Sequence, residues 1–342
     1  MHIPDGYLSP QTYLPLYGIT IPILAVAARK VKKTLRSRHV PLLALGAAFS
    51  FVIMMFNIPV PGGTSGHAVG AAIVAILLGP WAACLAVSIA VIIQAFLFGD
   101  GGLTAIGANC FNMAVVMPFV GYYSYRFIAG DSPLTSGRRC IAGAVAGYLA
   151  LNAAALYTAI QFGIQPLLAT GADGRPLYAP YSLSVAIPAM AVGHLLIFGF
   201  VEALVTALVI SYIQKRDPEL LLLHLGRSEE KEGTVGKLWL GLAMLAFLAP
   251  LGIVLPAAFR SRDAWGEWNA TAMKGMLGYV PAGMQKIADL WRAPFQDYTF
   301  AGDASGILMQ SLTYIASAFI GIAVIFLFIR IWGRFFTAKG DK

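Results

Sequence analysis

The first six residues of the chain, MHIPDG, hold the chemistry that can be read most directly. The amine of Met1, the backbone nitrogen between Met1 and His2, and Nδ1 of His2 can close two small fused chelate rings around one metal ion. Such a nitrogen-rich, roughly planar set suits Ni(II) or Cu(II), with Co(II) as a further choice. We expect the bulky histidine to keep Met1 in place, and Pro4, which lacks an N–H group, to end the chelate. A histidine in second place also occurs by chance, so other features must support this interpretation.

A second imidazole, that of His67, ends a segment rich in proline and glycine, PVPGGTSGH at 59–67. Imidazole is a favoured ligand for nickel, cobalt and zinc. Glycine permits close backbone approach and positive φ angles, which a loop that dips into a cavity requires. The alternative is a loop histidine with an ordinary hydrogen bond. Whether His67 and His2 share one face of the membrane decides between the two interpretations.

A third polar stretch, GDGGLTAIGANCFNM at 99–113, supplies Asp100 and two asparagines. Asn109 and Asn112 are three apart and therefore share one face of a helix. Beside a metal, these three side chains are candidates to orient the ligands through hydrogen bonds. The alternative for the two amides is that they hold membrane helices together.

Two ionisable residues, His194 and Glu202, lie eight apart within one apolar segment and fall roughly on one helix face. Ionisable side chains inside a membrane segment are candidates for function. Because this segment runs inward in the orientation argued below, we expect a structural or coupling role rather than metal binding. His39 and His224 fall in basic inner loops, where we expect solvated side chains.

The composition indicates the elements that must position these groups. Hydrophobic residues make up 58% of the 342 positions and charged residues only 12%, which is typical of polytopic membrane proteins. No basic region precedes the first apolar stretch, so we expect no cleaved signal peptide. The fold class is therefore an all-α polytopic membrane protein. Nine spans are expected, the third too short to cross a ~30 Å hydrocarbon core unaided: residues 12–28, 40–56, 67–78, 81–98, 108–127, 141–162, 181–213, 238–255 and 307–331.

Basic residues predict the orientation. Eighteen of the 24 lysine and arginine residues fall in four connections, at 29–38, 126–139, 215–237 and 330–342. If these face the cytoplasm, the positive-inside rule is satisfied. We expect a multi-pass protein of the bacterial plasma (inner) membrane. Its N-terminus then lies outside the cell and its C-terminus lies in the cytoplasm. We attribute the positive net charge to membrane topology and to attraction by the lipid bilayer surface. Basic residues at the ends of spans do not indicate a nucleic-acid partner.

The chain divides into two units joined by a linker. Residues 1–213 hold seven spans, residues 214–236 form a charged cytoplasmic linker, and residues 237–342 hold a two-helix hairpin. The outer loop of the hairpin, about 257–305, contains three tryptophans and is long enough to cover something on the outer face.

Cys84, Cys110 and Cys140 lack the spacing of a zinc site or disulfide and are expected to be small buried residues. No nucleotide-binding loop is present, so the chain cannot itself hydrolyse ATP.

Together, MHIPDG at the start, SGH at 65–67 and DGGLTA…N…NM at 100–113 resemble the CbiM/NikM family. Its members are substrate-binding S components of energy-coupling factor transporters for cobalt and nickel. The resemblance covers roughly residues 1–215, and the C-terminal hairpin is similar in topology and position to a fused CbiN/NikN subunit. It implies a bundle of seven helices that holds one metal near the outer surface. The ligands would be the Met1 amine, the amide and imidazole nitrogens of His2, and the His67 imidazole.

The resemblance also implies partners. Energy would come from a separate T component and two cytoplasmic ATPases. Ala44 and Ala48 form a small-xxx-small motif through which a helix can approach, and family members dock the T component through a similar alanine-rich face. Packing within the chain is the alternative. The substrate would be Ni²⁺ or Co²⁺, with no organic cofactor; both ions accept nitrogen donors, and the planar set and fused hairpin favour nickel.

The sequence therefore predicts a non-catalytic metal-uptake subunit. One rival is a secondary carrier or channel that uses His194 and Glu202 as a proton relay and needs no ATPase. The other is an intramembrane metalloenzyme. It requires an open coordination position and a general base, for which Asp5 and Asp100 are the outer-face candidates.

Overall fold

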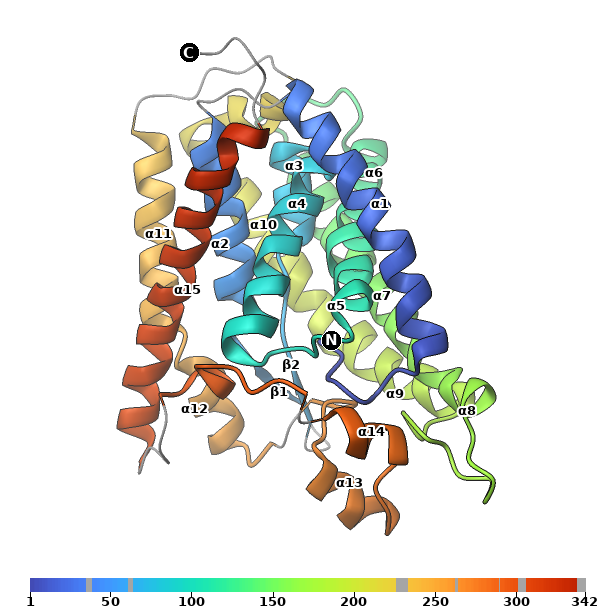
Figure 1. Cartoon of the computed structure of the whole chain (residues 1–342). Helices are drawn as coiled ribbons and strands as arrows, with labels where there is room; N and C mark the ends of the chain where they lie inside the picture. The colour runs from blue at the N-terminus through green and yellow to red at the C-terminus, as the bar shows by residue number, and fades with distance from the viewer. Residues whose placement is uncertain are drawn as a thin grey trace.

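The computed structural model describes residues 1–34, 39–60, 64–225, 233–261, 264–288, 290–300 and 306–336. The protein is an all-α membrane protein with one short β-hairpin (Figure 1). Six helical runs in the described part of the chain are long and apolar enough to cross a membrane. Several predicted features lie outside the described residues: Arg36, Arg38, the two glycines at 62 and 63, the charged centre of the linker at 226–232, and the tail at 337–342.

The described residues up to 216 form ten α-helices. Their apolar sequences form helices because unpaired backbone groups are costly in hydrocarbon. Proline begins α1 and α4, where its missing N–H has no helical partner to lose. They are α1 (Pro10–Thr34), α2 (Val40–Met54), α3 (Ala71–Leu78), α4 (Pro80–Ile93), α5 (Ile106–Asn109), α6 (Met117–Ala129), α7 (Gly137–Gly163), α8 (Gln165–Leu168), α9 (Leu183–Gly193) and α10 (Gly199–Arg216).

Three π-helical segments extend or join these helices: η2 (Gln94–Phe98), η3 (Cys110–Val116) and η4 (His194–Phe198). The run α5–η3–α6 corresponds to the predicted fifth span, and α9–η4–α10 to the seventh. Short π segments occur often at functional sites. Here η3 directly follows Asn109, and η4 begins at His194.

The C-terminal part adds two membrane-length runs with short helices between them. The predicted eighth span is α11 (Thr234–Leu248) with α12 (Leu251–Ala258), and the ninth is α15 (Ile307–Phe336). Both α11 and α15 pack against α2. The remaining elements are η5 (Pro218–Leu225) before α11, and α13 (Ala270–Leu277), α14 (Ala282–Ile287) and η6 (Gln296–Tyr298) in the outer loop.

The segment ahead of His67 is a β-hairpin rather than the irregular loop that its composition predicts. Strand β1 (Ile58–Val60) pairs antiparallel with β2 (Thr64–Gly66), with Pro59 opposite Ser65. This hairpin and the N-terminus lie towards the lower end of the bundle in Figure 1, whereas α1 and α15 end at the upper end. His2 and His67 therefore belong to the same end of the molecule.

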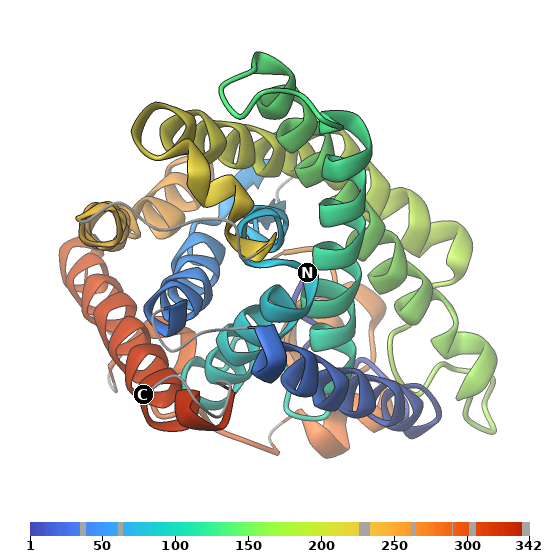
Figure 2. The same cartoon turned by 90° about the horizontal axis from the view of Figure 1, so that it is seen from above.

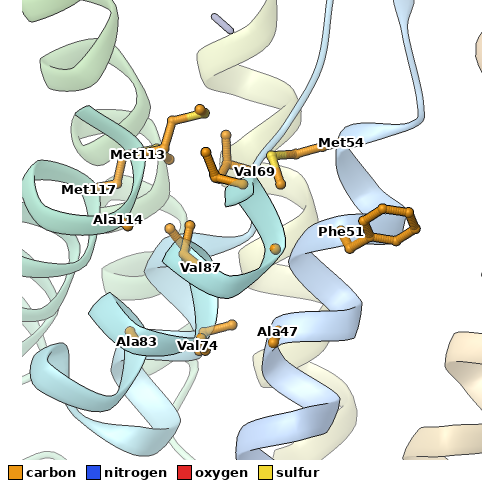
Figure 3. Packing of buried hydrophobic residues seen from close by; sticks show 14 of the residues in the cluster. Ala47, Phe51, Met54, Val69, Val74, Ala83, Val87, Met113, Ala114 and Met117 are labelled. Carbon is orange, nitrogen blue, oxygen red and sulfur yellow. The ribbon is translucent and has the colours of Figure 1, made fainter. Parts of the chain in front are cut away.

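The short third span corresponds to α3, which is buried inside the protein. Residues 71–76 of this helix are all buried, and seen from above α3 lies near the centre of the bundle (Figure 2). Figure 3 shows the packing around it: Val74 of α3 lies near Ala47 of α2 and Val87 of α4. A helix of this length cannot cross the hydrocarbon core, which agrees with the expectation from its sequence.

Two sequence predictions are corrected by burial. Ala44 and Ala48 are 1% and 0% exposed, because α2 packs between α4 and α15. They therefore offer no exposed docking face, and the alternative of packing within the chain holds. His39, expected to be solvated, is buried at the start of α2. Cys84 and Cys110 are buried and Cys140 is half-buried, and no disulfide joins these three described residues.

Candidate metal site

The N-terminal segment is buried against the residues that join η2 to α5. Asn109 brackets Ile3: its Oδ1 accepts a hydrogen bond from the Ile3 N–H at 2.8 Å, and its Nδ2 donates to the Ile3 carbonyl at 3.1 Å. The Gly102 N–H donates to the same carbonyl at 2.8 Å. Met1, His2 and Ile3 are all buried. One asparagine thus fixes the backbone directly after the predicted chelate.

Asp5 joins the same two segments. Its carboxylate accepts hydrogen bonds from the N–H groups of Leu103 and Thr104 at 2.9 and 2.8 Å, and from the Thr104 hydroxyl at 2.5 Å. Gly102 must be glycine here, since a Cβ would lie 2.2 Å from the Asp5 nitrogen. The glycine-rich stretch therefore packs closely against the N-terminal segment and holds it in place.

His67 lies beside His2, with ring centroids 5.1 Å apart and planes inclined by 32°. The His67 Nδ1 lies 3.0 Å from the Ala68 carbonyl. Because a carbonyl only accepts, Nδ1 carries the proton, and the lone pair is on Nε2. Burial, helped by the charges of the amine and His2, holds the pKa of His67 well below its usual value. The imidazole is therefore neutral, as a metal ligand must be.

Glu202 supports the turn that follows His67. Its carboxylate accepts hydrogen bonds from the N–H groups of Val69 at 2.8 Å and Gly70 at 3.0 Å. Gly70 has a φ of +72° directly before α3. Glu202 thus caps this helix and anchors the chain two residues after the imidazole, which supports a structural role. His194 is separate from it: its Nδ1 donates to the Met190 carbonyl at 2.8 Å within its own helix.

Asp100 contacts a predicted ligand atom directly. Its Oδ1 lies 3.0 Å from Nδ1 of His2, and its Oδ2 accepts a hydrogen bond from the Tyr298 hydroxyl at 2.6 Å. Burial raises the pKa of the Asp100 carboxyl, but the His2 imidazole and the Tyr298 hydroxyl together lower it well below its usual range. The charged carboxylate therefore holds the His2 ring from the side of Nδ1.

The loop between the two membrane-length runs of the C-terminal hairpin contributes to the candidate site. The Met1 amine donates a hydrogen bond to Oε1 of Glu267 at 3.1 Å, and Tyr298 reaches Asp100 as described. A cavity of about 1170 Å³ is lined by residues from both the N-terminal part and this loop, among them His2, His67, Asp100, Glu267 and Tyr298. Sequence reasoning missed Glu267 and Tyr298. The only indication was the length of the loop that contains them.

The residues present fit a transition-metal ion. Among the described residues, Nε2 of His67 and Nε2 of His2 are buried without a hydrogen-bond partner, and Nδ1 of His2 has only the poorly aligned contact with Asp100. No cluster of three or more His, Cys, Asp or Glu side chains in the described ranges is arranged to hold a metal. The donors on offer are instead two imidazoles and backbone nitrogens, a set that suits nickel, copper or cobalt.

The two predicted asparagines have different roles. Asn112 hydrogen-bonds to Thr158 and Gln161 of α7 at 3.0 and 2.8 Å, and so joins two helices. Only Asn109 reaches the N-terminal segment. Asn109→Ala would leave the buried N–H of Ile3 without a partner, at about 1–3 kcal/mol. We expect it to weaken nickel binding by about 10- to 100-fold, measured by calorimetric titration of the purified protein.

Asn112→Ala is the matched control, because it removes a buried amide with hydrogen bonds of similar length one helical turn away. We expect it to lower the unfolding temperature while nickel affinity stays within about threefold, an allowance drawn from its lack of contact with the ligands. Equal losses of affinity in both variants would contradict the positioning role of Asn109.

Comparisons with known proteins identify the family of the chain. Residues 2–220 match the family CbiM, described as cobalt uptake substrate-specific transmembrane region. The chain is 46% identical over 340 residues to the fused nickel transport protein NikMN of Rhodobacter capsulatus, with 95% of each chain covered. It is 42% identical to the probable fused nickel transport protein LarMN of Lactiplantibacillus plantarum, covering 96% of this chain and 97% of that one. A crystal structure of a transition metal transporter is 53% identical, with a TM-score of 0.60, and covers 66% of this chain and 97% of its own.

Proposed function

The chain belongs to the CbiM family of cobalt uptake substrate-specific transmembrane regions, and from that premise we propose that it binds one Ni²⁺ or Co²⁺ ion for transport into the cell. The ligands are the Met1 amine, the His2 amide nitrogen and Nδ1, and Nε2 of His67. One observation carries this proposal above the others. Nε2 of the neutral His67 imidazole is buried and has no hydrogen-bond partner among the described residues. The centroid of this ring lies 5.1 Å from that of the His2 ring.

The donor set explains what capture requires. The amine and the amide nitrogen must both lose a proton, so binding releases protons and becomes tighter as the pH rises. To bind the ion, Nδ1 of His2 must exchange Asp100 for the metal. Four nitrogens in a plane favour Ni²⁺, and two relatives that align over nearly the whole chain are named as nickel transport proteins. Nickel is therefore the proposed substrate, with cobalt second.

The remaining assignments follow from topology and the absence of an energy source in the sequence. We assign the metal-binding end to the outside and the C-terminus to the cytoplasm, in agreement with the positive-inside rule. Residues 1–213 form the binding unit, 214–236 the linker and 237–342 the hairpin. A T component and two ATPases would supply the energy. Because Ala44 and Ala48 are buried, we place the docking surface for the T component elsewhere on the chain.

Neither rival function gains support. A relay between His194 and Glu202 lacks a link, since the first is bonded to Met190 and the second to the backbone near His67. A general base at Asp5 is equally unsupported, because its carboxylate is occupied by hydrogen bonds to the 99–105 loop. The protein is proposed to move its substrate without converting it.

The test of this function compares the chain alone with the chain plus its partners. In cells that lack their own nickel and cobalt uptake, the full chain expressed with a T component and two ATPases should accumulate radioactive nickel. The chain alone should bind one ion per molecule after purification without raising the cellular content. Accumulation by the chain alone would favour the secondary carrier, and a purified chain that binds neither ion would refute the proposal.

A further inference from the structure

The outer loop of the hairpin brings one carboxylate to the N-terminal amine. Oε1 of Glu267 lies 3.1 Å from the Met1 nitrogen. Two donors that bind one divalent ion at about 2.1 Å, at a right angle to each other, lie about 3 Å apart. The observed separation is therefore that of neighbouring ligands as well as that of an ion pair. A metal ion can reach both atoms at once with little movement of either.

The turn that presents Glu267 is tightly built. The Glu267 N–H donates to the Ala264 carbonyl at 3.0 Å, which closes a turn over residues 264–267. Gly266 has a φ of +84°, a conformation that residues with a side chain rarely adopt, and a Cβ there would lie 2.6 Å from Phe162. The carboxylate is consequently presented by a defined backbone.

Both flanks of Glu267 are attached to the segments that carry the proposed ligands. On one side, the Trp265 N–H donates to Oγ1 of Thr64 at 2.8 Å, on the strand that leads to His67. On the other side, the Tyr7 hydroxyl donates to the Trp268 carbonyl at 2.8 Å, from the segment that begins with Met1. These two bonds hold the carboxylate between the two halves of the ligand set.

Glu267 is also the more accessible partner of its ion pair. Its side chain is 25% exposed, against 1% for Met1, and it lines the same cavity as His2 and His67. The described lining contains four carboxylates, from Asp5, Asp100, Glu267 and Asp297, but only one arginine and no lysine. Such a wall attracts cations. An ion that crosses the cavity towards the amine therefore meets the Glu267 carboxylate on its way.

We propose that Glu267 is a transient ligand, which receives the incoming divalent ion and passes it to the Met1 amine as the amine releases its proton to water in the cavity. This rests on the proposed function and assigns one residue of the C-terminal hairpin to metal exchange. Glu267 does not belong to the final four-nitrogen set. Before binding, Glu267 faces the single positive charge of the amine; after binding, it faces the same net charge, that of the divalent ion and the deprotonated amide together. The carboxylate therefore favours neither end state and lowers the barrier for arrival and departure alike. It changes both rate constants by the same factor and leaves the dissociation constant unchanged.

The test measures both rates of nickel binding to the purified full chain in lipid nanodiscs. Association is followed by rapid mixing with Ni²⁺, and dissociation by mixing the loaded protein with excess chelator. For Glu267→Gln we expect both rate constants to fall by about 10-fold, the lower range of electrostatic effects on association, with an unchanged dissociation constant. Glu267→Asp, which keeps the carboxylate, should recover a large part of both rates. Glutamine can still accept a hydrogen bond from the amine, so a purely structural role predicts wild-type rates.

Asp173→Asn is the charge-matched control, since Asp173 is 62% exposed, pairs with Arg175, and is absent from the described cavity lining. Its rates should equal those of the wild type. A matching fall of both rate constants in Glu267→Gln, absent in the control, supports the proposal; any other pattern overturns it, including a weaker dissociation constant that arises from faster release. If the wild type itself binds no nickel, the proposed function fails instead, so the two failures are distinguishable.

Discussion

Two methionines added before Met1 are expected to weaken nickel binding by at least about 100-fold, beyond the range typical for residues that only support a ligand. The addition moves the free amine two residues away from His2. The two fused rings of the proposed chelate can then no longer form, and the histidine is also too far along the chain to close a chelate with the amine and two amides. Every original side chain is retained. The Met1 side chain is only 1% exposed and its amine is paired with Glu267, so the added residues must also displace packed atoms.

The measurement is calorimetric titration with Ni²⁺, together with the absorption spectrum of the bound ion, which reports a planar nitrogen set. The control is two methionines inserted after Gly174, an exposed turn residue with open space around it. It adds the same atoms and should bind nickel as the wild type does. Normal affinity in the N-terminally extended chain would mean that the amine is no ligand.

Loss of the second imidazole is the other large expected effect. His67→Ala should weaken nickel binding by at least about 100-fold, because it removes the only proposed ligand from outside the first two residues. His2→Ala should be at least as severe, since it removes the imidazole from the chelate itself. Unfolding temperatures in detergent, measured beside nickel affinity, separate loss of the site from loss of the fold.

His194→Ala is the matched control for His67→Ala. Both histidines are buried, and in both Nδ1 lies within hydrogen-bond distance of a backbone carbonyl, at 2.8 Å for His194 and 3.0 Å for His67. They differ in what lies beside the ring: His194 contacts Phe198, whereas His67 contacts His2. Nickel affinity should survive the change at 194. If His67→Ala retained nickel binding as well, the imidazole pair would lose its assigned function.

Most membrane-length helices could be predicted because hydropathy is a local property of the chain. The stretches at 141–162 and 307–331 are apolar enough to require helical backbone in a membrane whatever they pack against. Burial within the bundle is not local. Composition alone does not distinguish α3, which is covered by other helices, from a helix that faces lipid, nor could it show that Ala44 and Ala48 are covered by α4 and α15.

The polar residues of the 99–113 stretch illustrate the same limit at the site. Helical spacing correctly placed Asn109 and Asn112 one turn apart, yet one holds Ile3 and the other holds α7. Asp100, predicted as a residue that orients the ligands, contacts Nδ1 of His2, and spacing gave no sign of which ligand it would reach. Residue type and spacing indicate that such groups are positioned for hydrogen bonding. The partner depends on which segments the fold brings to them.

By itself, the sequence determined that the donors of the proposed chelate, on Met1 and His2, are consecutive along the chain and need no fold to come within reach of one metal. It also determined the membrane class through its apolar stretches. The tertiary structure alone decided that His67 meets His2, that Asn109 and Asp5 seat the N-terminal segment, and that Glu267 lies against the amine. That last contact joins residues 266 positions apart. No local pattern encodes such a pair, since it results from the packing of the hairpin against the bundle.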